Sequence, residues 1–320
     1  MQLEFIEKSK RDLWNRFVLE NSGSFLQSFE WGEFQEGFSK KVWRVAVLKE
    51  NKIVLAAQVI KEKMKFKSYF YIPYGPVLAD KNDSALLDLL LDSLKDLAKK
   101  EEAVFLRIEP AFPLPQTKVL LRSASKRLQP QRTLLLDLER GEEEILQSFD
   151  KRTRYNIKLA QKKGVQVRVL ENYTKDFYKL LSKTKERQEF RSYPEAHYER
   201  LMSLNGDLKP RIFLAELDGE AIVATLAIFF GNTVTTLHTG FDYCHRALKA
   251  PYLVRWSIMQ EGKRLGKKWC DFWGIDEKKW PGVTRLKRSF NGIEVEYGEG
   301  KEMVFSPAWY LLYNIVRVIL

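Results

Sequence analysis

Positively charged side chains recur at helical spacing near the middle of this chain. Residues 142–163 are expected to form one helix, with an apolar stripe on one side and an end at Gly164. No glutamate lies within 151–163 to pair with the cationic stripe, unlike in an ion-paired surface helix. The stripe therefore favours contact with phosphate groups over a merely solvated face. The predicted contacts are Lys151, Arg152, Arg154 and Lys158.

The overall charge favours the same kind of partner. The 320 residues include 54 Lys and Arg against 42 Asp and Glu, a formal net charge of +12. A basic balance of this size favours RNA, a phosphate-bearing substrate or an anionic membrane face. Ordinary solubilising charge is the alternative.

Several chemistries lack the residues they need. The only histidines are His197, His238 and His245, and the only cysteines are Cys244 and Cys270, so we expect no metal centre. There is no GxSxG, Walker or GxGxxG motif. The low cysteine content favours a reducing compartment. The first residues lack an apolar signal core and no apolar run is long enough to cross a bilayer, so we expect a cytoplasmic protein.

Two segments resemble copies of one unit. The first is a hairpin over 44–60, and the second is a hairpin over 211–228. Aligning Arg44 with Arg211 also aligns Ala57 with Ala224 without a gap. Each copy continues into a strand that reaches a glycine, Gly75 or Gly240. An internal repeat sets the architecture before local motifs do, and it predicts two similar α/β domains with a cleft between them.

The remaining periodicities support an α/β fold, because strand and helix patterns alternate. Further strands are expected at 69–79, 103–108, 133–138, 269–275 and 293–297. Further helices are expected at 84–100, 174–189, 195–205 and 251–266, with a last helix that begins near Pro307. The last helix is very apolar. We expect it to dock on a domain; the alternative is contact with the inner membrane face.

The doubled unit of hairpin, strand and Pro-initiated helix resembles acyltransferases of the acetyltransferase-like (GNAT) fold. Such enzymes hold the pyrophosphate of coenzyme A on a Gly-rich loop before the helix that would begin here at Pro251. The segment 244–251 reads Cys-His-Arg-Ala-Leu-Lys-Ala-Pro and contains no glycine. We therefore expect no coenzyme A and no other cofactor, and an acyl donor of a different kind.

Five ordered motifs are similar to those of the Fem family of non-ribosomal peptidyltransferases, which build peptidoglycan cross-bridges. They are Phe25-Leu-Gln-Ser-Phe-Glu-Trp-Gly32, Tyr71-Ile-Pro-Tyr-Gly-Pro76, Lys151-Arg-Thr-Arg-Tyr-Asn-Ile157 with Ala160 and Gly164, Asp271-Phe-Trp-Gly-Ile275, and Leu286-Lys-Arg-Ser-Phe-Asn-Gly292. Each motif is weak alone, but together they cover nearly the whole chain.

The resemblance implies two GNAT-type domains, the first formed by 1–131 with about 302–320 and the second by 132–301. The interval 171–211 holds only two helical patterns, so this is expected to be a form without the coiled-coil arm of some relatives. The implied donor is aminoacyl-tRNA, and the implied acceptor is a lipid-linked or nucleotide-linked muropeptide. Both are polyanions, in agreement with the charge. The sequence leaves open the amino acid, the accepting position and the oligomeric state.

The implied reaction is aminolysis of an ester, in which a stem-peptide amine attacks the carbonyl carbon. Lys287 occupies the position of the family's catalytic lysine, and a fixed cation there would stabilise the oxyanion. We expect Lys287 to lie outside the core. Glu109 occupies a position where the family can place an acid near the acceptor, and it would orient or deprotonate the amine. A structural role for Glu109 is the alternative.

The resemblance also assigns contacts to the acceptor. These predicted contacts are His238, Arg191, Tyr193, His197, Trp31 and Tyr74, with Trp273 and Gly274 as a wall of the cleft. Where relatives can have a phosphate-binding lysine after the Trp-Gly pair, this chain has Glu33. Two alternatives remain open: another acyltransferase of this fold, acting on a different amine or a polysaccharide, and a non-catalytic RNA-binding protein.

Overall fold

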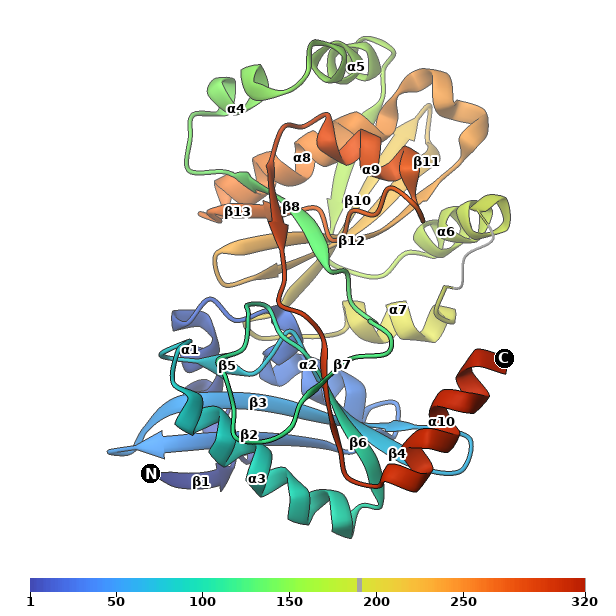
Figure 1. Cartoon of the computed structure of the whole chain (residues 1–320). Helices are drawn as coiled ribbons and strands as arrows, with labels where there is room; N and C mark the ends of the chain where they lie inside the picture. The colour runs from blue at the N-terminus through green and yellow to red at the C-terminus, as the bar shows by residue number, and fades with distance from the viewer. Residues whose placement is uncertain (189–191, 320) are drawn as a thin grey trace. The chain divides into compact units, whose positions relative to one another are not determined.

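The computed structural model describes residues 1–188 and 192–319, which divide into two compact units. Unit 1 comprises Met1–Gln131 and Glu296–Leu320, and unit 2 comprises Arg132–Val295. Each unit contains one mixed sheet with helices packed against it (Figure 1). The chain leaves unit 1 at residue 131 and returns to it at 296, whereas we expected the return near 302.

Unit 1 is built on a sheet with the order β1-β2-β3-β4-β6-β15-β7, and β5 pairs with β3. Its core includes the buried leucines of α3 at 86, 87, 90, 91 and 94. The strands are β1 (Gln2–Phe5), β2 (Val42–Lys49), β3 (Lys52–Lys63), β4 (Ser68–Pro73), β5 (Val77–Leu78), β6 (Ala103–Glu109), β7 (Arg122–Ser123) and β15 (Lys301–Val304). The helices are η1 (Lys8–Lys10), α1 (Arg11–Glu20), η2 (Phe25–Gln27), α2 (Phe29–Glu36), α3 (Ser84–Lys100) and α10 (Pro307–Ile319).

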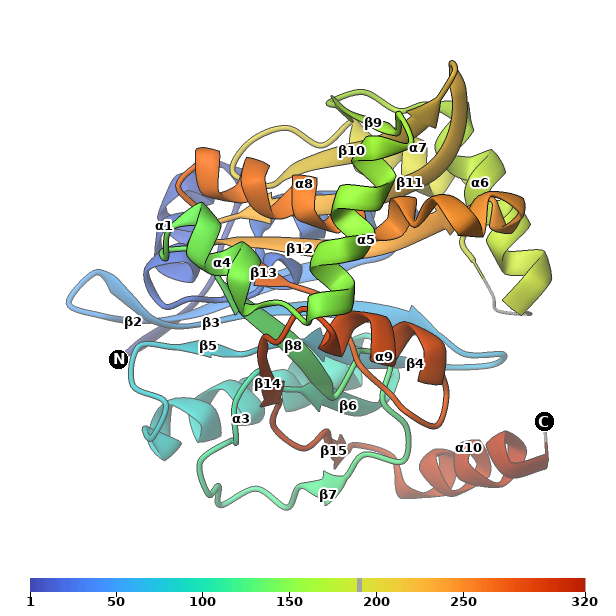
Figure 2. The same ribbon diagram turned by 90° about the horizontal axis from the view of Figure 1, so that it is seen from above.

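Unit 2 has a sheet with the order β14-β8-β13-β12-β11-β10-β9. Helix α8 packs across this sheet with α5 beside it, as Figure 2 shows from above. The strands are β8 (Arg132–Asp137), β9 (Gln166–Leu170), β10 (Lys209–Leu217), β11 (Glu220–Phe230), β12 (Thr233–Phe241), β13 (Trp269–Asp271) and β14 (Ile293–Glu296). The helices are α4 (Glu142–Ser148), α5 (Lys151–Lys162), α6 (Lys175–Gln188), α7 (Glu195–Met202), η3 (Tyr243–Leu248), α8 (Ala250–Arg264) and α9 (Pro281–Arg288).

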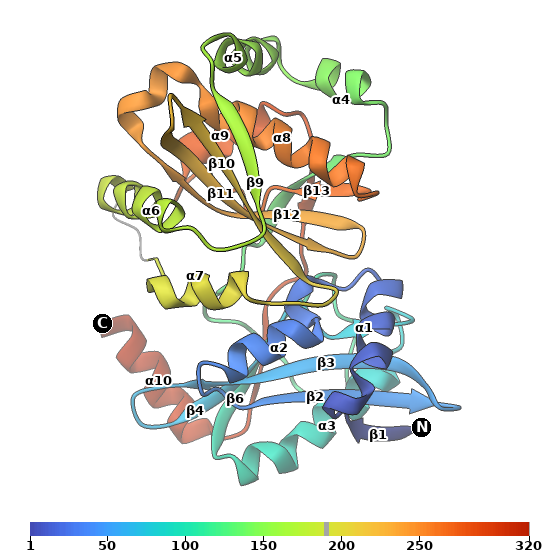
Figure 3. The same cartoon turned by 180° about the vertical axis from the view of Figure 1, so that it is seen from behind.

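The seven strands along the main path of each sheet correspond in order. The repeated hairpins are β2–β3 and β10–β11, and they lie in different sheets at equivalent positions (Figure 3). The next strand, β4 or β12, pairs in parallel with β6 or β13. The internal repeat therefore describes two copies of one topology.

The strand beyond each parallel pair comes from a part of the chain that is distant in the sequence. In unit 1 it is β15, which follows unit 2 in the sequence, and in unit 2 it is β8, which follows the first repeat. The buried ion pair between Arg107 on β6 and Glu302 on β15 helps to fix this arrangement. Breaking such a pair leaves an uncompensated charge in the core, so the C-terminal strand is integral to unit 1.

The prediction of a single helix over 142–163 is wrong. It is broken into α4 and α5 because Phe149 and Asp150 adopt extended backbone conformations, with ψ of 156° and 143°. The break turns the Phe149 ring into the core, where it packs edge-on against Trp256 and Phe290. Burial of an aromatic side chain thus outweighs helical continuity at this point.

Candidate functional site

The candidate site lies where two parallel strands of unit 2 end. Strand β13 pairs in parallel with β12 only as far as Asp271, and the chain then turns through 272–275. The carboxyl ends of such strands are the usual ligand-binding edge of an α/β sheet. We expected a strand over 269–275, but Trp273 and Gly274 both have positive φ values, 51° and 86°. A bulky residue with positive φ is uncommon and is often found at functional sites.

Hydrogen bonds hold this turn in place. The Asp271 carboxylate accepts bonds from the Thr133 hydroxyl and from the Trp273 N–H, the latter at 2.8 Å. The Gly274 N–H in turn donates to the Thr133 hydroxyl oxygen at 3.2 Å. The turn therefore presents the carbonyl oxygens of residues 273 and 274 in fixed positions.

Lys287 reaches those two carbonyl oxygens from α9. Its Nζ donates to the oxygen of Gly274 at 2.6 Å and to that of Trp273 at 3.0 Å. The residue is only 8% exposed, so the expectation that it lies outside the core is wrong. Burial and the nearby Arg255 guanidinium lower the pKa of Lys287 to about 7, and the Asp271 carboxylate offsets only part of this shift. An ammonium group has three donors, and these two bonds use two of them.

Arg255 is a second buried cation beside Lys287, and sequence reasoning missed it. It lies on α8, is 7% exposed and donates to the Pro251 carbonyl at 3.1 Å. Burial lowers the pKa of Arg255 to about 10, so it remains charged at neutral pH. The signal was an arginine among the buried apolar residues of α8. Its field opposes the protonation of Lys287.

His238 lies on β12, directly after a bulge. Leu226 pairs with His238 and Ala227 with Thr236, so Leu237 is an extra residue on this strand. Bulges re-aim side chains and occur often beside active sites. Burial, with a smaller effect of Lys287, lowers the pKa of His238 to about 4. The imidazole is therefore neutral at pH 7.

Three of the predicted acceptor contacts form one aromatic cluster. The rings of Tyr193 and His197 stack with centroids 3.9 Å apart, and Tyr193 meets His238 edge-on at 6.4 Å. Tyr198, which was not predicted, lies between them and is fully buried, with its centroid 5.6 Å from that of His238. Arg191 lies outside the described residues. The structure thus brings together the predicted tyrosine and histidines of unit 2.

The predicted residues of unit 1 have structural contacts. Glu109 is fully buried and accepts bonds from the Tyr71 hydroxyl at 2.8 Å and from the N–H groups of Leu128 and Gln129 at 2.6 and 2.8 Å. Burial and the adjacent Glu109 carboxylate raise the pKa of Tyr71, so the phenol remains a donor. Both carboxylate oxygens are therefore occupied in locking the 128–129 loop to β6.

Tyr74 and Trp31 also pack within unit 1. Tyr74 is 2% exposed and donates to the Pro130 carbonyl at 2.6 Å, which leaves little surface for an acceptor. Trp31 is partly exposed and packs against Phe25 and Phe34. Of these two, the exposure of Trp31 is the more compatible with ligand contact.

Helix α5 carries both exposed cations and one that is hydrogen-bonded within the protein. Lys151, Arg152 and Lys158 are exposed on α5. Arg154 instead donates to the carbonyl oxygens of Gln147 and Phe149, bridging the break between α4 and α5. The phosphate-contact prediction therefore fits the first three side chains better than Arg154.

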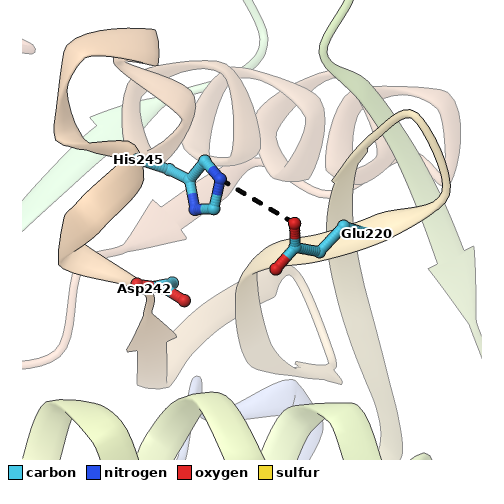
Figure 4. A group of neighbouring side chains, drawn as sticks. All are labelled: Glu220, Asp242 and His245. Carbon is cyan, nitrogen blue, oxygen red and sulfur yellow. Dashed lines mark ion pairs between the residues drawn. The ribbon is translucent and has the colours of Figure 1, made fainter.

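A separate polar group joins Glu220, Asp242 and His245, with one potential ligand atom from each within 4.8 Å of the others (Figure 4). The Asp242 carboxylate also pairs with Lys183 and accepts from the Cys244 N–H. Lys183 lowers the pKa of Asp242. Because an ammonium group already compensates this carboxylate, the group is explained as an ion-pair network and needs no metal.

Comparisons with known proteins agree with this architecture. The FemAB family model matches residues 10–120, 118–223 and 215–317. A lipid II:glycine glycyltransferase of Staphylococcus aureus strain MRSA252 is 26% identical over 305 residues, covering 89% of this chain and 68% of the relative. Another from Staphylococcus aureus is 25% identical, covering 87% and 67%.

Solved structures show the same fold. The crystal structure of FemX has a TM-score of 0.84 at 18% identity, covering 98% of this chain and 99% of that chain. A tandem GNAT protein from the clavulanic acid pathway has a TM-score of 0.58 at 11% identity, covering 96% and 99%. The prediction of two GNAT-type domains is confirmed.

None of the helices in the described ranges combines the length and the apolar character needed to cross a bilayer.

The relatives are named as glycyltransferases, which confirms the prediction of an aminoacyltransferase enzyme. The family model matches most of the chain, and the chain therefore belongs to the FemAB family.

Proposed function

We propose that this protein transfers an amino acid from aminoacyl-tRNA to a stem-peptide amine of a peptidoglycan precursor, forming a cross-bridge. The observation that carries the proposal is the buried ammonium of Lys287, fixed on two carbonyl oxygens beside His238. The name shared by the relatives, lipid II:glycine glycyltransferase, supports an acceptor of this class and favours its lipid-linked form.

The reaction forms one C–N bond and breaks one C–O bond. A neutral amine attacks the ester carbonyl, the carbonyl oxygen becomes negative, and the ribose oxygen leaves as a hydroxyl after gaining a proton. The amine loses one proton, so protons balance overall. A donor fixed at the developing oxyanion typically lowers the activation free energy by about 3 kcal/mol.

Lys287 suits two of these tasks. As an ammonium it has one donor beyond its two carbonyl bonds, and that donor can face the oxyanion. With a pKa near 7 it can also give up a proton to the departing ribose oxygen at neutral pH. Lys287 is therefore proposed as the catalytic residue, and its charge state is set by Arg255 and burial.

The aromatic cluster is proposed to receive the acceptor. His238 is neutral, so it would bind a peptide or phosphate oxygen by hydrogen bonding and not by charge. Tyr193 is 54% exposed and offers a ring face to the same ligand. Glu109 has both oxygens engaged, so we propose no proton transfer through it.

The test combines purified protein, a pool of charged tRNAs and lipid-linked or nucleotide-linked muropeptides, with product masses as the readout. A mass increase of one amino-acid residue on the muropeptide supports the proposal and identifies both substrates. Uncharged tRNA is the matched control. Acetyl transfer from acetyl-coenzyme A, with micromolar affinity by calorimetry, would overturn it in favour of an ordinary acetyltransferase. Binding of tRNA without transfer to any acceptor would favour the non-catalytic RNA-binding alternative.

A further inference from the structure

Helix α10 is fixed to the sheet of unit 1 by two tyrosines. Tyr310 is 8% exposed and donates its hydroxyl to buried Glu302. Tyr313 accepts a bond from Arg107 at 3.2 Å, and both tyrosine rings pack against Phe105. Figure 1 shows α10 as the red helix at the end of the chain. These contacts determine which face of the helix points outward.

The outward face of α10 is apolar. Residues 307–316 contain no charged side chain. Seven positions in that stretch, at 307, 308, 309, 311, 312, 315 and 316, are exposed and cover an arc of roughly 200° at 100° per residue. Five of them are large hydrophobic residues: Trp309 at 39%, Leu311 at 63%, Leu312 at 44%, Ile315 at 49% and Val316 at 40% exposed.

Helix α3 on the same sheet shows the usual alternative. Five of its leucines are buried, at 86, 87, 90, 91 and 94, and its exposed positions include Asp92, Lys95, Asp96, Lys99 and Lys100. Soluble proteins seldom expose contiguous apolar surface, and such surface usually marks an interaction site. The contrast between two helices in one unit therefore indicates that α10 covers the sheet with one face and binds something else with the other.

The turn between β3 and β4 extends the same surface. Phe66 at its tip is 73% exposed, and the segment 61–67 reads Lys-Glu-Lys-Met-Lys-Phe-Lys. Lys67 lies with its Nζ 5.4 Å from the Trp309 ring centroid, and Met64 packs in the cluster that contains Tyr310. Lysines thus border the apolar residues of the turn and the helix.

We propose that this surface docks on a bilayer that contains anionic lipids. We call it the apolar–lysine surface, and it consists of Phe66, Trp309, Leu311, Leu312, Ile315 and Val316 with Lys63, Lys65 and Lys67. Interfacial helices bury apolar and aromatic side chains at the headgroup boundary while lysines contact anionic headgroups. The net charge of +12 acts in the same direction. The inference concerns unit 1 alone and does not rest on the proposed transfer reaction.

The charge pattern distinguishes a bilayer from the other occupants. A second copy of this strongly basic chain would bring like charges together, at a cost to association. An apolar protein groove would need no lysine border. Anionic headgroups complement both the lysines and the exposed apolar side chains, so the bilayer is the occupant that satisfies the whole surface.

The experiment measures cosedimentation of the full chain with two kinds of vesicle. One kind contains phosphatidylcholine alone, and in the other about 30% of the lipid is anionic phosphatidylglycerol. We expect binding to the anionic vesicles that weakens as salt is raised. Lys63→Glu with Lys65→Glu should weaken binding to the anionic vesicles about 25-fold or more, because each lysine contributes about fivefold. Leu311→Glu with Ile315→Glu should abolish it.

Controls carry the same kinds of change elsewhere on unit 1. Lys95→Glu with Lys99→Glu reverses the same number of charges on α3, and Leu120→Glu places a charge at another exposed leucine. Unchanged binding in these controls, with loss only in the surface variants, supports the proposal. Equal effects in both sets, or no vesicle binding by the wild type, would overturn it. So would a wild-type dimer in ultracentrifugation that the Leu311→Glu and Ile315→Glu changes dissociate.

Discussion

Corresponding edges of the two sheets carry an acidic residue at the end of the inner parallel strand, yet they differ in what surrounds it. In unit 1, Glu109 ends β6 and accepts bonds from three neutral donors. In unit 2, Asp271 ends β13 and partly offsets the burial and the Arg255 charge that lower the pKa of Lys287 to about 7. The first edge locks a loop, whereas the second holds two buried cations.

The difference shows where a duplicated fold can place chemistry. A carboxylate saturated by neutral donors stabilises structure and has little left to offer a substrate. A buried lysine with a depressed pKa is costly to hold and changes protonation near physiological pH, which is typical of functional sites. We therefore assign the chemistry to the edge in unit 2, and four changes test that assignment.

The largest effect is expected for Lys287→Met. Turnover should fall by roughly 100- to 1,000-fold, because one oxyanion donor is lost, while the dissociation constant of the muropeptide changes little. Single-turnover rates with saturating acceptor measure the chemical step. Arg288→Met is the matched control, since Arg288 is the next residue and pairs with Glu277 and Glu294 near the surface. A folded Lys287→Met protein with the wild-type rate would remove Lys287 from the mechanism.

The same variant should also make the free energy of unfolding less dependent on pH. The pKa of Lys287 in the folded protein is about 7, below the ordinary lysine value of 10.5 that applies to the unfolded chain. Between these pH values the unfolded state binds more protons, so wild-type stability should rise with pH from 7 to 10.5. Lys287→Met removes that dependence. Denaturant unfolding at pH 7 and pH 9 should therefore show a smaller pH difference in the variant than in the wild type.

The second effect concerns pH and Arg255. If the ammonium form of Lys287 is the active one, turnover should decline above about pH 7, approaching tenfold for each further pH unit. Arg255→Met removes a neighbouring positive charge and should move this decline to higher pH. The measurement is the pH profile of turnover at saturating substrate. A structural role alone would lower activity at every pH without moving the profile, and that outcome would reject the coupling.

How much of this site could be predicted from the sequence depends on the range of the interactions involved. Lys287, His238, Tyr193 and His197 were all named from the family resemblance, and the structure groups them within unit 2. Arg255 was missed because an arginine in an apolar helical pattern looks like a residue at the helix edge. Its importance comes from packing against residues distant in the sequence.

Two other features were also beyond local patterns. The turn at Trp273 reads as a strand because its aromatic residues favour one, yet hydrogen bonds to Asp271 and Thr133 hold it in another conformation. The positions of β8 and β15 depend on pairing between segments far apart in the chain. Periodicity within a short window predicts an element but not its partner strand.

The third effect is on polyanion binding by α5. Lys151→Glu with Lys158→Glu should weaken tRNA or precursor binding by about tenfold or more and flatten its salt dependence, because fewer counterions are released. Arg154→Gln is the comparison, since Arg154 is engaged with carbonyl oxygens of the α4–α5 break and should act on stability first. Binding titrations across a salt series provide the measurement. Identical slopes for the double variant and the wild type would return this face to an ordinary solvated surface.

The smallest effect on turnover is expected for Glu109→Gln. The glutamine amide can accept through only one of its two terminal atoms, so at least one of the donors from Tyr71, Leu128 and Gln129 loses its acceptor. An unsatisfied buried donor costs about 1–3 kcal/mol, and the free energy of unfolding should fall by that amount. Turnover of the folded fraction should change by less than about threefold, because no proton passes through this carboxylate in the proposed reaction, whereas removal of a general base typically costs 100-fold or more. Denaturant unfolding and single-turnover rates on the same preparation separate the two effects. A large fall in turnover with unchanged stability would make Glu109 a catalytic residue, and the chemistry would then require both units.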